Sequence, residues 1–243
     1  MTRRTKALGR GPILFLTLLL AYCSIVYELL LAQSLAVALG QTFLRYNVTI
    51  GFYLASLGLG ALLCSRVPAG DRVERLVDVE LVLALLGALS PMLVLGWNLG
   101  ACRAAVVLGL PLNGLFYGLV IHVFDHALIV AIGLLSGFEL PLLMQLNGDR
   151  ANEVLAVDYG GTLIGAILFP LVLLPGLGIL TAAILTGALN ALCGLYLLFA
   201  KSRSPGALRL GAYGGALALM GFLFSSREPL QRVLSTSFLL CRP

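Results

Sequence analysis

The chain alternates between long apolar runs and short polar segments. Most of the runs reach about twenty residues, the length that an α-helix needs to cross the hydrocarbon core of a bilayer. They are continuous rather than alternately apolar and polar, so the pattern does not fit a transmembrane β-barrel. The pattern predicts an all-α fold, a polytopic transmembrane helical bundle of about eight helices. We expect these helices at about residues 12–39, 44–65, 79–98, 104–122, 126–147, 154–174, 179–200 and 210–225.

Two of these boundaries depend on polar or turn-forming residues inside apolar sequence. The stretch from Ala104 to Leu146 is too long for one crossing, and we place a break at the polar segment 122–126. The segment 175–178, Pro-Gly-Leu-Gly, predicts a tight turn between the sixth and seventh helices. The sequence thus divides into a basic N-terminus (1–11), a transmembrane bundle (12–226) and a short polar C-terminal tail (227–243).

Composition supports the same class of protein. Hydrophobic residues make up 60% of the chain and charged residues only 11%. The formal net charge of +5 comes from basic residues at predicted helix ends, which is typical of topology determinants and not of a nucleic-acid site. We therefore predict the lipid bilayer as a partner and no nucleic acid.

The distribution of lysine and arginine predicts an orientation in the cell (inner) membrane. With the N-terminus inside, ten of the sixteen basic residues fall on the inner side, so both termini are expected in the cytoplasm. Lys201, Arg203 and Arg209 run against this orientation. The Arg-rich N-terminus resembles a signal peptide, but its apolar run is too long for one, and we interpret it as a retained first helix.

Three carboxylates lie in apolar surroundings: Glu28, Glu139 and Asp158. An ionised carboxylate at membrane depth costs a few kcal/mol or more, so such residues usually have a partner or a function. Pro141 follows Glu139 closely and frees a backbone carbonyl in its helix, as in the half-helix binding sites of transporters. The structural alternatives are a protonated Glu139 that donates one hydrogen bond, and an Asp158 stabilised by a helix N-terminus.

A weak internal sequence repeat includes two of the same acids. Tyr27-Glu28-Leu29 recurs as Phe138-Glu139-Leu140, which suggests a four-plus-four duplication with Glu28 and Glu139 facing each other, although chance similarity is common among Leu-rich helices. Two close carboxylates favour a cation between them, and a plain structural hydrogen bond is the alternative for Glu28. The predicted ligand-binding residues are Glu28, Glu139, Asp158, Tyr27 and Gln33.

Small residues predict sites of close helix packing. Gly161 and Gly165 have the GxxxG spacing that lets helix backbones approach, and we add Gly58 and Pro141 to this set. His122, Asp125 and His126 lack evident third and fourth ligands, and the five cysteines have no metal-binding spacing, so no metal and no cofactor are predicted. No nucleotide-binding or catalytic-triad motif is evident, and no catalytic residue is assigned.

Four segments carry a resemblance to a known family: IVYELLLAQ (25–33), IGFYLASLGLGALL (50–63), GFELPLL (137–143) and the long segment 152–178. They resemble the membrane portion of multi-pass spermidine synthase-like proteins, also described as polyamine aminopropyltransferase-like. In that family the helices precede a soluble Rossmann-like domain that binds decarboxylated S-adenosylmethionine. That domain has no counterpart in this sequence, so the resemblance implies the membrane-embedded domain without the catalytic domain.

From the acids and the resemblance we expect a membrane module that is not itself an enzyme. It would bind or translocate a small cationic or amine ligand, such as a polyamine. The alternative is a membrane scaffold or anchor that recruits a separately encoded enzyme through the 66–78 loop or the C-terminal tail. A third interpretation, an intramembrane enzyme with Glu28 and Glu139 as acid and base, has no nucleophile or metal to support it.

Overall fold

The computed structural model describes residues 9–66, 72–112, 114–148, 150–201 and 206–232. These residues form seven α-helices and one π-helical segment and contain no strand, so the all-α prediction is confirmed. Most of the predicted N-terminus and C-terminal tail, and residues 67–71 of the 66–78 loop, lie outside the described residues. The elements are α1 (Arg10–Leu39), α2 (Thr42–Cys64), α3 (Arg72–Val107), α4 (Leu115–Leu146), α5 (Ala151–Leu168), η2 (Phe169–Leu173), α6 (Leu174–Lys201) and α7 (Ala207–Ser225).

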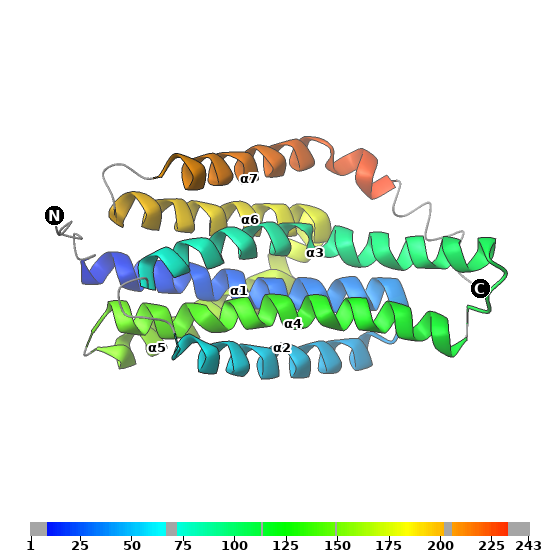
Figure 1. Ribbon diagram of the computed structural model, residues 1–243, viewed down its shortest axis with the longest axis horizontal. Helices are drawn as coiled ribbons and strands as arrows, with labels where there is room; N and C mark the ends of the chain where they lie inside the picture. Colours follow the sequence, from blue (N-terminus) through cyan, green and yellow to red (C-terminus); the bar gives the residue numbers. More distant parts are fainter. Residues whose placement is uncertain (1–8, 67–71, 113, 149, 202–205, 233–243) are drawn as a thin grey trace.

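The helices form an elongated bundle in which successive helices run in opposite directions (Figure 1). α1 is the central helix and contacts α2, α3, α4, α5 and α6. The closest neighbours are α2 with α4, α3 with α6, and α1 with α5. α7 lies on the outside, against α6 and α3.

The predicted break at 122–126 is wrong, because these residues lie inside α4. The acid among them has a partner that does not require the helix to end: Asn98 Nδ2 on α3 donates to both carboxyl oxygens of Asp125 at 3.2 Å. The chain breaks earlier, between α3 and α4, where Gly109 has a φ of 64° and Pro111 follows. A positive φ and a proline end a helix for backbone reasons, whereas a hydrogen-bonded aspartate does not.

This shift of the break changes the helix count and the direction of α4. The predicted third helix extends to Val107 in α3, the predicted fourth and fifth helices largely merge into α4, and the described residues form seven α-helices rather than eight. The helix that carries Glu28 and the helix that carries Glu139 run antiparallel (Figure 1). A parallel four-plus-four duplication requires them to run in the same direction, so the fold does not support it.

The turn predicted at 175–178 coincides with a reversal of the chain. Gly178 has a φ of 74° and a ψ of 170°, values outside the helical range, inside the segment assigned to α6. Just before it, η2 contains Pro170, whose missing N–H fits a π-helical turn. α5 and the body of α6 are therefore two separate passes along the bundle (Figure 1).

Glycines set the closest helix contacts. A Cβ at Gly60 of α2 would meet the Leu134 carbonyl of α4, and a Cβ at Gly137 would meet the Leu57 carbonyl of α2. Gly161 and Gly165 of α5 lie in the same way against α1, next to Leu18 and Ile25 respectively. A Cβ at Gly58 would meet no atom within 4 Å.

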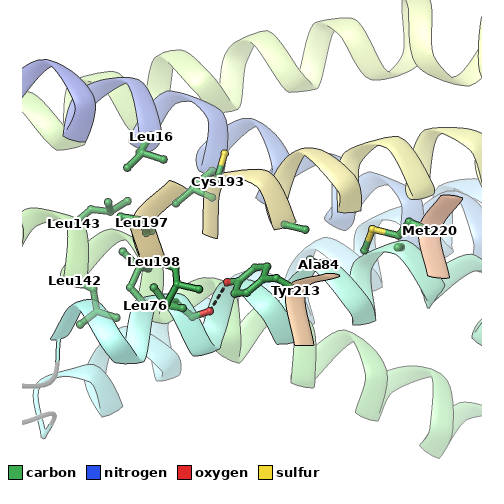
Figure 2. Packing of buried hydrophobic residues seen from close by; sticks show 14 of the residues in the cluster. Leu16, Leu76, Ala84, Leu142, Leu143, Cys193, Leu197, Leu198, Tyr213 and Met220 are labelled. Carbon is green, nitrogen blue, oxygen red and sulfur yellow. Dashed lines mark hydrogen bonds between the residues drawn. The ribbon is translucent and has the colours of Figure 1, made fainter. Parts of the chain in front are cut away.

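Buried apolar side chains fill the space between the helices, as Figure 2 shows for one of the two core clusters. Tyr213 of α7 points into this cluster, and its hydroxyl donates to the Val77 carbonyl of α3 at 2.6 Å. Leu76 and Leu198 lie close by. A tyrosine with a satisfied hydroxyl thus joins the outer helix α7 to the core.

Candidate functional site

The most unusual feature of the interior is a pair of carboxyl groups, Glu80 of α3 and Glu139 of α4. Their side chains are 0% and 5% exposed, and each carboxyl group interacts with the other. Asn190 of α6 is also fully buried, and its Nδ2 donates to the Glu80 backbone carbonyl at 3.0 Å. Its side chain also interacts with the Glu80 carboxyl group. We call Glu80 and Glu139 the Glu80–Glu139 pair.

Four acceptor atoms of these three residues have no hydrogen-bond partner in the described part of the chain: Glu80 Oε1, Glu80 Oε2, Glu139 Oε1 and Asn190 Oδ1. In the residues that the structure describes, no lysine, arginine or histidine forms a salt bridge with either glutamate or is among the groups that act on their charges. A buried polar atom without a partner costs about 1–3 kcal/mol, so four in these three interacting residues require an explanation.

The predicted acids are brought together only in part. Asp158 of α5 is half-buried and acts electrostatically on Glu139. Glu28 of α1 is buried, but among the described residues it makes no direct contact with Glu139. Both Glu28 and Glu139 instead lie near Tyr53 of α2.

Tyr53 is the centre of a small polar network that joins three helices. Its hydroxyl oxygen lies 2.9 Å from Ser136 Oγ of α4 and 3.0 Å from Ser24 Oγ of α1. It also lies 3.1 Å from the Ser24 carbonyl oxygen. Because the tyrosine is fully buried, these contacts satisfy a hydroxyl that would otherwise be stranded in the core.

The two remaining predicted ligand residues have structural surroundings. The Tyr27 ring lies directly against Gly87 of α3, and its hydroxyl donates to the Thr186 carbonyl at 3.5 Å, near the Glu80–Glu139 pair. Gln33 accepts a hydrogen bond from the Tyr46 hydroxyl at 2.5 Å, in a contact between α1 and α2. Pro141 lies inside α4, which continues to Leu146.

The sequence analysis missed Glu80. It follows directly on the charged loop 66–78, at the start of the helix predicted at 79–98, where an acidic residue needs no special partner. In the structure α3 already begins at Arg72, which places Glu80 two turns inside the helix. Helical spacing contained the signal, because Leu76, Leu83 and other apolar residues three to four positions away share a face with Glu80.

The two histidines in the N-terminal part of α4 form a separate polar group. The rings of His122 and His126 lie 5.8 Å apart, and His126 also packs edge-on against Phe52. Asp125 is hydrogen-bonded to Asn98 rather than turned toward the histidines. Among the described residues, no three histidine, cysteine or acidic side chains are grouped as a metal site would require.

Comparisons with known proteins identify relatives that are enzymes. The chain is 31% identical over 235 residues to "Polyamine aminopropyltransferase 2" of Ralstonia nicotianae, which covers 90% of this chain and 43% of that protein. It is 35% identical over 208 residues to "Polyamine aminopropyltransferase 2" of Streptomyces coelicolor (81% of this chain, 35% of the relative). It is 30% identical over 190 residues to "Polyamine aminopropyltransferase" of Leptospira interrogans (74% and 34%). The chain spans less than half the length of these curated relatives. No protein-family model and no solved structure matches the chain.

These names correct the functional predictions. The relatives are named as aminopropyltransferases, so the expectation that the chain is not an enzyme is wrong. The expected binding or transport of a cationic ligand is wrong for the same reason, and so is the alternative of a scaffold. The names support the words polyamine and spermidine synthase-like, and they support neither transport nor a membrane location. With relatives of one name matched over as much as 90% of the chain, the comparisons support a spermidine synthase-like family for this protein.

Proposed function

We propose that this chain is the helical part of a polyamine aminopropyltransferase and takes part in the transfer of aminopropyl groups to polyamines. The observation that carries the proposal is the 31% identity over 235 residues, nearly the whole chain, to a relative of that name. Because the chain covers only 43% of that relative, the activity is assigned to an enzyme of which this bundle is one part.

The direct test replaces the matched region of the Ralstonia nicotianae relative with this chain and measures the polyamine product made from an aminopropyl donor. We expect the chimera to form product. Two glycines of α2 supply a matched control: Gly60→Leu would force α2 away from α4, whereas Gly58→Leu adds a side chain where no atom lies within 4 Å. We expect only Gly60→Leu to abolish the activity. A chimera that folds and accumulates but forms no product would refute the proposal.

We further propose that the bundle is embedded in the cell membrane. Six helical segments are long and apolar enough to cross a bilayer, and the segment Ala151–Ala200 contains the reversal at Gly178. Large apolar side chains also face outward, including Phe43, Leu62 and Leu171, which are at least 70% exposed. Such a surface is suited to lipid and unusual in water. Carbonate washing of membranes tests this location, and recovery of the chain in the wash would refute it.

The orientation proposed for the bundle differs from the sequence expectation. With α5 and α6 as separate passes there are seven crossings, so the start of α1 and the end of α7 lie at opposite ends (Figure 1). By sequence position, eleven of the sixteen lysines and arginines belong to the N-terminus up to the first residue of α1, or to the regions between α2 and α3, α4 and α5, and α6 and α7 with their adjoining helix ends. This distribution favours a cytoplasmic location for the end of the bundle where α1 begins. These eleven are Arg3, Arg4, Lys6, Arg10, Arg66, Arg72, Arg75, Arg150, Lys201, Arg203 and Arg209.

With seven crossings, the three basic residues that ran against the orientation expected from eight helices no longer do so. Lys201 at the end of α6 and Arg209 in the first turn of α7 lie at the end of the bundle where α1 begins, and Arg203 stands between them in the sequence. An alkaline phosphatase reporter, active only outside the cytoplasm, tests this orientation. We expect activity when the reporter follows α7 and none when it is inserted between α2 and α3. The reverse pattern would overturn the orientation.

A further inference from the structure

The Glu80–Glu139 pair presents a problem of hydrogen-bond donors. An ionised carboxylate can only accept hydrogen bonds, and the oxygen of an asparagine side chain also only accepts. The four unpartnered atoms at the site, three from the pair and Asn190 Oδ1, are therefore all acceptors if both glutamates are ionised. The Asn190 amide has one N–H besides the one donated to the Glu80 backbone carbonyl, so most of these acceptors still need donors.

We propose that the Glu80–Glu139 pair binds two protons and is a neutral pair of carboxylic acids. One proton sits on Glu139 Oε1 and is donated to one carboxyl oxygen of Glu80. The second sits on the other Glu80 oxygen and is donated to Asn190 Oδ1. Two protons thus form two hydrogen bonds that use each of the four unpartnered acceptor atoms once.

The surroundings favour protons over an ionised pair. The groups that act on the pair or lie near it are Cys23 and Tyr27 of α1, Tyr53 of α2, Asp158 of α5, Cys193 of α6 and Tyr213 of α7. None of these side chains can supply a positive charge, and Asp158 is itself an acid. Two adjacent buried carboxylates without a cation are too costly to be retained, whereas a protonated carboxyl group is neutral and is also a donor.

The proposal also explains why Asn190 lies at this point of α6. One of its two amide hydrogens is donated to the Glu80 backbone carbonyl at 3.0 Å. Its oxygen has no hydrogen-bond partner among the described residues, and the proposed acid hydrogen on Glu80 would supply one. Protonation would thus connect α3, α4 and α6 through a continuous hydrogen-bonded chain in the buried interior of the bundle.

Infrared spectroscopy of the purified full chain tests the proposal, because a carboxylic acid has a C=O stretching band that a carboxylate lacks. Difference spectra between the wild type and Glu80→Gln or Glu139→Gln, recorded at neutral pH, isolate each carboxyl group. We expect each difference spectrum to contain the lost acid band. Glu153→Gln is the control, since Glu153 is ion-paired with Arg10, and there we expect only carboxylate bands. Carboxylate bands for both Glu80 and Glu139 would overturn the proposal.

A second measurement leaves the pair intact, in case the substitutions prevent folding. In Glu28→Gln protein labelled with carbon-13 at the glutamate carboxyl groups, the labelled glutamates are the pair and three that form salt bridges with arginines. Those three are Glu74, Glu153 and Glu228. We expect an isotope-shifted acid band from the pair, and its absence would overturn the proposal. Neither spectrum depends on aminopropyl transfer, so this result is independent of the proposed function.

Discussion

Acidic side chains on the surface near one end of the bundle and in its interior are neutralised in different ways. At the surface, near the end where α1 begins, Arg209 Nε and Nη2 donate to the two carboxyl oxygens of Asp78 at 2.8 and 2.9 Å. Arg10 holds Glu153 in the same bidentate manner, at 2.9 and 2.7 Å. In the interior, Glu80 and Glu139 have each other and Asn190, and no basic residue among those described. The surface pairs are accessible to water, where an arginine costs little to place, and the interior pair is not.

The comparison predicts its largest effect for removal of one interior acid. Glu139→Ala would leave one carboxyl oxygen of Glu80 without its proposed donor and would open a cavity in the core. We expect it to lower the free energy of unfolding by about 3 kcal/mol or more. Denaturant unfolding of the detergent-solubilised protein, followed by circular dichroism, measures this loss. An unchanged midpoint would mean that the interior tolerates an unpaired acceptor.

A smaller effect is expected where a buried acid loses a donor but keeps its volume filled. Asn98→Leu removes the amide that donates to both oxygens of Asp125, a residue with 0% exposure. We expect a loss of about 1–3 kcal/mol, measured by the same unfolding experiment. If Asp125→Asn in the same protein restores the lost stability, the cost comes from the unpaired acid. If the double variant is no better, packing of the introduced leucine is responsible.

The isosteric change in the interior should be milder still. Glu139→Gln keeps the size of the side chain, and its amide nitrogen can donate to Glu80 as the proposed acid does. We expect a loss of about 1 kcal/mol or less, clearly below that of Glu139→Ala. A glutamine variant as unstable as the alanine variant would argue that the site requires charge rather than donors.

The smallest effect is expected at the end of the bundle. Arg209→Gln breaks the contacts to Asp78 and Glu74 in a partly exposed position, and we expect a loss of about 0–1 kcal/mol. High salt should reduce this difference further, whereas it should leave the Glu139→Ala difference unchanged. Unfolding at low and high salt measures both. A salt-dependent effect at Glu139 would contradict the neutral pair.

The sequence was sufficient for the parts of the fold that depend on long apolar runs and strong turn formers. It predicted the all-α class and the reversal at Gly178, since both follow from local composition. It misplaced the break at 122–126 because the hydrogen bond from Asn98 that keeps Asp125 inside α4 comes from a residue 27 positions away. No local pattern contains such a contact.

The candidate site was predicted only in part for a similar reason. Glu139 was recognised because it interrupts an apolar helix, but its partner Glu80 stands next to charged residues at the start of a predicted helix, where an acid did not stand out. Glu28 was placed opposite Glu139 by a sequence repeat that required parallel helices. The prediction that the chain is not an enzyme rested on the lack of local catalytic motifs, and the relatives named as aminopropyltransferases contradict it.

The left-handed backbone of Gly178 has one further consequence. In the proposed membrane arrangement, the reversal there turns α5 and α6 into two crossings, which makes the total odd. A straight continuation would make the total even. The conformation of a single residue therefore decides in which compartment the chain after α7 emerges, and a residue with a side chain would resist that conformation. The backbone conformation of Gly178 thus links a local steric preference to the topology of the protein in the membrane.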